Sequence, residues 1–195
     1  MKSAILKYLP NALTFCNMAI GVIVVCSMLL NDSLFSIRLA CYLIYLAVVL
    51  DMLDGHLARY LNLSSEMGKQ LDSFADLVTF GVAPIAIFVS MVQYISWYIL
   101  LVLLFYPLAG AFRLARYNLQ KDFGYFVGLP ITVAGFIMVT ILLVNSYIYS
   151  GFTMRFIIFY SVLTLALSIM MVSNFRVNRL IRAKELSAEK LNFKT

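Results

Sequence analysis

Long apolar runs alternate with short polar stretches along the chain up to about residue 174. Each run is long enough for a membrane helix, since about 20 apolar residues in a helix cross the hydrocarbon core of a bilayer. A transmembrane β-barrel would instead show alternating segments of about ten residues. We therefore predict an all-α, polytopic membrane protein. Its six expected spans lie at about residues 12–30, 35–61, 66–92, 96–116, 130–149 and 154–174.

Residues that disfavour helix mark the ends of these runs. Pro10 precedes the first run, and the polar residues 62–65 separate the second run from the third. Asn and Ser favour turns because their side chains compete for backbone hydrogen bonds. The basic and apolar stretch 2–9 predicts a short N-terminal interfacial helix. We expect a single membrane domain over residues 1–195, with a basic cytoplasmic tail from about residue 175.

Composition supports a membrane protein and indicates its orientation. The chain is 63% hydrophobic and 12% charged, whereas soluble domains are about 25% charged. The net charge of +6 does not indicate nucleic-acid binding, because the cations fall in short loops and near the chain ends, where they orient membrane helices. With six spans, every Lys and Arg except Arg38 and Arg155 lies on one side. We therefore expect both termini in the cytoplasm.

Four aspartates interrupt the apolar second and third runs: Asp51, Asp54, Asp72 and Asp76. A carboxylate at membrane depth is unfavourable unless it is paired, hydrated or bound to a metal. The first pair is three residues apart and the second pair four apart, so each pair shares one helix face. Both pairs are similarly far from the turn at 62–65. Antiparallel packing of the two helices is thus expected to bring all four carboxylates together.

Such a cluster suits a hard divalent cation. Oxygen ligands select Mg²⁺, Mn²⁺ or Ca²⁺, and four carboxylates fit one or two ions that also bind a diphosphate. Gly55 and Gly68 leave space for a ligand near the helix backbone, and Arg59 is placed to pair with a phosphate. His56 is interpreted as a bystander. The alternative from another class is a small cation or proton transporter that uses the same aspartates.

The spacing of these residues resembles the signature of a known family. The chain reads Asp51-x-x-Asp54-Gly55-x-x-Ala58-Arg59, then eight residues, then Gly68-x-x-x-Asp72-x-x-x-Asp76. This pattern is similar to that of the CDP-alcohol phosphatidyltransferases. These membrane enzymes transfer a phosphatidyl group from a CDP-linked lipid to an alcohol and release CMP. Every fixed position of the signature is present, and the family's architecture also has six spans.

The resemblance implies a role for each residue of the signature. The implied ligands of Mg²⁺ or Mn²⁺ are Asp51, Asp54, Asp72 and Asp76. Asp76 is implied to be the general base as well. The residues implied to lie along the CDP moiety are Gly55, Ala58, Arg59 and Gly68. The family is commonly homodimeric, so a homodimer is expected.

The flanks of the signature resemble the phosphatidylserine synthase branch of the family. Ser73 and Leu77 stand where the phosphatidylglycerophosphate branch usually carries proline and lysine, and LDSFADLVTFGVAP (71–84) is similar to the serine branch. The resemblance implies transfer from CDP-diacylglycerol to L-serine, in phospholipid biosynthesis. The expected location is the cell membrane, with the active site facing the cytoplasm. Inositol phosphate, glycerol 3-phosphate or an ether-lipid (archaetidyl) donor remain alternatives.

Polar residues near the expected cytoplasmic ends of other runs are further candidates. Thr14 and Asn17 share one face of the first run and are expected to bind cytidine or phosphate. Arg113 and Arg116 end the fourth run three residues apart and are candidates to clamp the serine carboxylate or the lipid phosphate. Asn118 is a third candidate for this clamp. Helix packing and positive-inside anchoring are the alternatives for these residues.

Overall fold

The computed structural model of the protein describes residues 2–30, 36–61, 65–92, 95–119, 125–148, 153–173 and 176–178. Within these ranges, side chains are described except at 2–8, Arg59, 125–127 and 176–178. The predicted basic tail therefore lies almost entirely outside the described residues.

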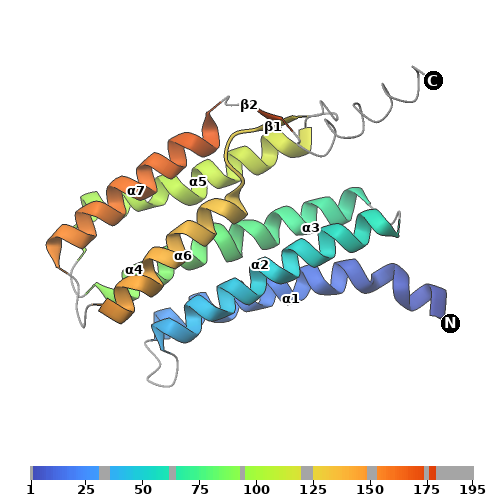
Figure 1. The fold of residues 1–195 in the computed structure, drawn as a ribbon, viewed down its shortest axis with the longest axis horizontal. Helices are drawn as coiled ribbons and strands as arrows, with labels where there is room; N and C mark the ends of the chain where they lie inside the picture. Colours follow the sequence, from blue (N-terminus) through green and yellow to red (C-terminus); the bar gives the residue numbers. More distant parts are fainter. Residues whose placement is uncertain are drawn as a thin grey trace, which may run out of the picture.

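The predicted helical bundle is confirmed (Figure 1). The long helices are α1 (Lys2–Leu30), α2 (Ile37–Tyr60), α5 (Trp97–Leu119), α6 (Ile131–Ile148) and α7 (Met154–Val172). The third run forms three consecutive helical segments: α3 (Glu66–Asp76), η1 (Leu77–Val82) and α4 (Ala83–Met91).

Five helical stretches are long and apolar enough to cross a membrane, by length and composition: Leu9–Leu30, Glu66–Met91, Trp97–Leu119, Ile131–Ile148 and Met154–Val172. They confirm a polytopic membrane protein. The second predicted span, α2, is 24 residues long but carries four charged residues and is not among the five. The sixth span therefore stays a prediction.

α1 differs from the expected arrangement at its start. The basic and apolar stretch 2–9 predicts a short helix of its own, ahead of a span that Pro10 opens, but the helix runs without a break from Lys2 to Leu30 with Pro10 inside it. Proline removes one backbone donor and usually bends a helix. Helices in lipid tolerate proline because side chains can bond the backbone groups that it frees. One turn later, the Thr14 hydroxyl donates to the Pro10 carbonyl at 3.1 Å, the bond to the residue four positions back that helical threonines often form.

The third run contains a π-helix, η1, that the sequence pattern did not predict. Two neighbouring helices approach it closely through glycine. A Cβ on Gly21 of α1 would collide with Thr79, and one on Gly135 of α6 would lie 2.8 Å from the Phe80 side chain. The Tyr106 hydroxyl of α5 donates to the Phe80 carbonyl at 3.1 Å. Small residues allow such close helix contacts in membranes. η1 is the segment that α1, α5 and α6 all contact here.

α1 packs against α2, which runs antiparallel to it, and α5 packs against α7, which runs in the same direction (Figure 1). The largest fully buried side chains include Tyr106, Tyr160, Phe80 and Phe88. The rings of Phe88 and Tyr160 stack with centroids 4.2 Å apart. Many large apolar side chains point outward along every long helix, as expected for surfaces that face lipid.

A short two-stranded ribbon lies at the end of the bundle where α5 and α7 finish (Figure 1). β1 (Tyr125–Val127) pairs antiparallel with β2 (Arg176–Asn178), in the register Phe126 opposite Val177. The Leu129 amide also donates to the Met170 carbonyl at 3.2 Å. The ribbon joins the α5–α6 connection to the end of α7, and the hydrophobic pattern gave no sign of it.

Candidate active site

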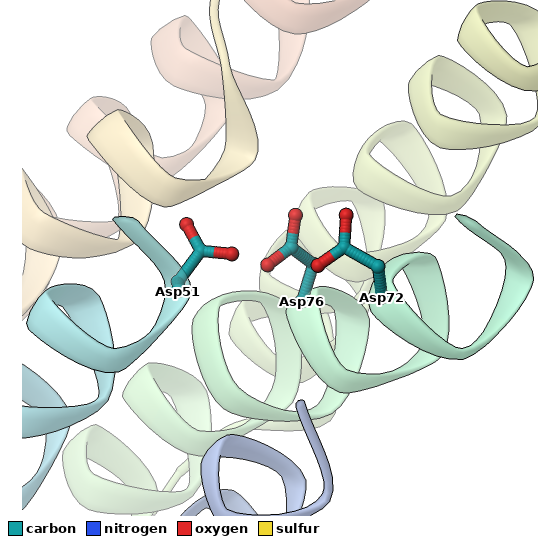
Figure 2. A group of neighbouring side chains, drawn as sticks. All are labelled: Asp51, Asp72 and Asp76. Carbon is teal, nitrogen blue, oxygen red and sulfur yellow. The ribbon is translucent and has the colours of Figure 1, made fainter. Parts of the chain in front are cut away.

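Three of the four predicted aspartates meet in one place. Asp51 comes from α2, and Asp72 and Asp76 come from successive turns of α3 (Figure 2). One carboxylate oxygen from each lies within 4.8 Å of the other two. The spacing of four residues on α3 places its two carboxylates on one face, and α2 brings the third opposite them. We call Asp51, Asp72 and Asp76 the acidic triad.

The fourth aspartate, Asp54, is not a member of the acidic triad. Its side chain is buried, with 4% exposed. Its Oδ2 accepts a hydrogen bond of 2.8 Å from the hydroxyl of Thr14 on α1. The expected cluster of four is therefore arranged as a triad plus a buried Asp54 on the α1 side of α2. Its role as a metal ligand stays a prediction.

Two residues from other helices act on the acidic triad. Thr132 of α6 donates to Asp51 Oδ2 at 3.4 Å. Arg113 of α5 is buried, with 7% exposed, and its positive charge acts on Asp76. Arg113 Nε and Asp76 Oδ1 are both buried without a hydrogen-bond partner. The site thus combines three gathered carboxylates with one buried cation.

The donor set fits a hard divalent cation. Three carboxylates at this separation repel one another unless a positive charge lies among them. Oxygen-only ligands are those preferred by Mg²⁺, Mn²⁺ and Ca²⁺. The unpartnered, buried Oδ1 of Asp76 is the kind of atom that a metal ion would satisfy. The acidic triad can therefore hold such an ion, as the sequence predicted.

The other signature residues lie around α2 and the start of α3. Gly68 receives a cap from Ser65, whose hydroxyl accepts from the Gly68 amide at 3.0 Å. A Cβ on Gly68 would lie 3.3 Å from Asn11 Oδ1 of α1. Gly55 and Ala58 are half-buried and His56 is exposed. The side chain of Arg59 lies outside the described residues, so its predicted phosphate contact stays a prediction.

Asn17 lies one turn along α1 from Thr14 and is fully buried. Neither its Oδ1 nor its Nδ2 has a hydrogen-bond partner within the protein. Its backbone carbonyl accepts from Thr79 of η1 at 3.1 Å. A buried, unsatisfied amide is costly, so Asn17 suits the polar ligand that the sequence predicted for it.

The three candidates for the acceptor clamp are in different surroundings. Arg113 is buried, and its charge acts on Asp76 of the acidic triad. Arg116 instead donates to carbonyls at the end of α7, the shortest bond being 2.9 Å to Val172. Asn118 donates to Ser73 Oγ at 2.9 Å. Sequence reasoning missed Thr132 as a partner of Asp51, because that contact depends on how α6 packs against α2.

Comparison with known proteins agrees with this site. The family model described as CDP-alcohol phosphatidyltransferase matches residues 7–172. The chain belongs to the CDP-alcohol phosphatidyltransferase family. The match covers all the membrane helices and the whole acidic triad, so the resemblance seen in the signature is confirmed.

Similar proteins point to one branch of this family. The chain is 39% identical over 136 residues to the CDP-diacylglycerol–serine O-phosphatidyltransferase of Bacillus subtilis, covering 69% of this chain and 75% of that protein. It is 35% identical over 173 residues to the Helicobacter pylori protein of the same name, covering 86% and 70%. A Methanocaldococcus jannaschii protein of that name is 34% identical over 135 residues, covering 69% and 61%.

Proposed function

We propose that this protein transfers the phosphatidyl group of CDP-diacylglycerol to the hydroxyl of L-serine, yielding phosphatidylserine and CMP. The observation that carries the proposal is the acidic triad, gathered from α2 and α3 in a membrane protein of this family. The serine acceptor is supported by the names of the similar proteins of Bacillus subtilis, Helicobacter pylori and Methanocaldococcus jannaschii. The enzyme class is a phosphotransferase for a substituted phosphate group.

The donor site lies along α1, α2 and α3 in this proposal. Asp51, Asp72 and Asp76 would hold Mg²⁺ or Mn²⁺, with Asp54 as a further ligand close by. When bound, the ion neutralises diphosphate oxygens and makes CMP a better leaving group. The residues assigned to the CDP moiety are Thr14, Asn17, Gly55, Ala58, Arg59 and Gly68. Support comes from the buried, unsatisfied amide of Asn17.

The acceptor reacts on the side of Asp76 and Arg113. The serine hydroxyl oxygen forms a bond to the phosphorus that carries the diacylglycerol. The bond from that phosphorus to the CMP oxygen breaks, and the hydroxyl proton passes to the carboxylate of Asp76. Arg113 is a buried guanidinium whose charge acts on this carboxylate, and it is suited to bind the serine carboxylate or the lipid phosphate.

The same proposal includes six spans, with both termini and the site on the cytoplasmic side of the cell membrane. α2 is 24 residues long, which at about 1.5 Å per residue exceeds the thickness of a bilayer core. Arg38 and Arg155 are the second residues of α2 and α7, so they lie at the opposite end from Arg113 and Arg116. This distribution supports the positive-inside orientation. An interfacial start of α1 and a homodimer complete the proposal.

The test is a CMP-release assay on the purified protein in detergent or in vesicles. CDP-diacylglycerol is supplied with Mg²⁺ or Mn²⁺ and with L-serine, glycerol 3-phosphate or inositol phosphate in turn. We expect CMP release with serine alone among these acceptors, formation of phosphatidylserine, and loss of both on chelation of the metal. CMP release driven equally by the other acceptors would contradict the serine assignment. Absence of CMP release with every acceptor would contradict the transferase function.

A further inference from the structure

Three polar side chains near the end of α5 interact with two different helices, α3 and α7. Arg113 acts on Asp76 of α3. Arg116, one turn later, bonds to the end of α7. Asn118 bonds to Ser73 of α3. The last turns of α5 therefore lie between the helix that carries two members of the acidic triad and the helix that ends beside the ribbon.

Arg116 binds the carbonyl groups that end α7. Its Nη1 donates to the Val172 carbonyl at 2.9 Å. Its Nη2 donates to the Met171 and Ser173 carbonyls at 3.3 and 3.4 Å. The last carbonyls of a helix have no partner within the helix, and a cation there also suits the helix dipole. The planar guanidinium can serve several of them at once.

Gly128 closes the same junction from the α5–α6 connection. Its φ of 76° is a conformation that favours glycine. A Cβ there would collide with the Met171 carbonyl oxygen and lie 3.1 Å from Arg116 Nη2. The next amide, of Leu129, donates to the Met170 carbonyl at 3.2 Å. Arg116 and Gly128 thus meet the same turn of α7, and we call this junction the α7 clasp.

Asn118 holds the other side of α5. Its amide donates to Ser73 Oγ, and Ser73 in turn donates to the Lys69 carbonyl at 3.0 Å. Ser73 directly follows Asp72 of the acidic triad. The end of α5 is thus tied to α3 next to the metal-binding carboxylates, while Arg116 ties it to α7.

We infer that Arg116 is a positioning residue that acts through Arg113, and not a ligand of the substrate. The α7 clasp holds the end of α5 so that the buried Arg113 keeps its position relative to Asp76. Releasing the clasp lets α5 and α7 separate at this end, and Arg113 moves relative to the acidic triad. A displacement of about 1 Å at a reacting site can cost about 100-fold in rate. This inference rests on the proposed function, since Arg113 acts on that reaction.

The test is a pair of double-mutant cycles on the full-length protein, read as kcat/KM for CMP release. The first cycle combines Arg116→Gln with Gly128→Ala. The glycine substitution disrupts the clasp without removing a charge. We expect each single change to lower kcat/KM by about 10- to 100-fold. We expect the double variant to lie close to the more damaging single variant, because both changes break one junction. Arg155→Gln, an exposed arginine at the start of α7, is the matched control and leaves activity unchanged.

The second cycle asks whether Arg116 acts through Arg113. Arg113→Lys keeps the charge and serves as a background with measurable residual activity. We expect Arg116→Gln to have little further effect in that background. A residue that acts independently of Arg113, through the architecture alone or by binding substrate directly, would add its full cost in the Arg113→Lys background, and multiplicative losses there would overturn the inference. Because the second cycle does not use Gly128, it decides the matter even if Gly128→Ala does not fold.

The two proposals fail in different ways. If serine does not drive CMP release by the unaltered protein, the serine assignment is wrong, and the same cycles are run with the acceptor that does. If the unaltered protein uses serine but the losses multiply, only the role of Arg116 is wrong. An increase in the serine KM on Arg116→Gln that persists unchanged in the Arg113→Lys background would assign Arg116 to the serine itself.

Discussion

The acidic triad and the α7 clasp differ in whether their polar groups find partners within the protein. In the clasp, one guanidinium meets three carbonyls of α7 that a helix end leaves without partners. In the triad, three like charges are gathered within 4.8 Å and Asp76 Oδ1 has no hydrogen-bond partner. The clasp stabilises the helical bundle without any ligand. The triad is unfavourable for the fold by itself, and a bound ion and substrate give a reason for it.

This difference separates architecture from chemistry in a chain where most surfaces are apolar. Polar groups that complete one another inside the protein indicate how the helices are held together. Buried polar groups that the protein does not satisfy, here Asp76 Oδ1 and the amide of Asn17, indicate where a ligand belongs. Substitutions in the triad should therefore act on the reaction or on metal binding directly, whereas those in the clasp should act on it only through the position of α5.

The largest effect is expected for Asp76→Asn. Loss of the general base should lower kcat by about 100- to 10,000-fold. The fold should not suffer, because the change removes one of three like charges from the triad. Kinetics of CMP release and the apparent melting temperature in detergent check the two expectations together. Full activity in this variant would show that the triad is not the reacting centre.

A smaller effect is expected for Thr132→Val, which removes the hydroxyl that bonds to Asp51 Oδ2 at 3.4 Å. Partners of metal-binding side chains typically contribute about 10- to 100-fold in metal affinity. We expect the Mg²⁺ or Mn²⁺ concentration for half-maximal activity to rise by about tenfold. Thr132→Ser keeps the hydroxyl and serves as the control. A metal dependence unchanged by Thr132→Val would show that the Thr132 hydroxyl does not help Asp51 to bind the ion.

Thr14→Val tests whether Asp54 belongs to architecture or to chemistry. The change removes the 2.8 Å hydrogen bond to a buried carboxylate, which should destabilise the protein by about 1–3 kcal/mol. If Asp54 also binds the metal or the donor, the KM for CDP-diacylglycerol rises as well. Thermal unfolding and donor titrations distinguish these effects, with Thr14→Ser as the control. A stable variant with normal kinetics would remove Thr14 and its bond from both roles.

The smallest effect is expected for Tyr106→Phe, on the architectural side. The change removes a buried hydrogen bond of 3.1 Å to the Phe80 carbonyl of η1. We expect a loss of about 1 kcal/mol in stability with kinetics unchanged. Tyr160→Phe, at a bond of 3.5 Å to the Pro84 carbonyl, should cost less. Altered metal dependence in Tyr106→Phe would mean that η1 transmits changes to the triad.

Local patterns in the chain were sufficient to predict the helices and the aspartates of the site. Apolar runs of membrane length predicted the helical bundle, because the bilayer requires every backbone group to be satisfied within the segment. The spacing of Asp72 and Asp76 put both on one face of a single helix. Asp51 is similarly far from the turn at 62–65, so it was expected at the same height on α2. These are short-range relations that helix geometry alone imposes.

Contacts between distant parts of the chain depended on packing that no local pattern encodes. Asp54 meets Thr14 across 40 residues, Asp51 meets Thr132 across 81, and Arg116 meets Val172 across 56. The π-helix arises where glycines of α1 and α6 let both helices approach it. Periodicity shows which face of a helix is polar, but a side chain's partner depends on which helix covers that face and at what height. For this reason Arg113 and Arg116 look equivalent in the sequence, whereas in the folded protein one faces the acidic triad and the other holds α7.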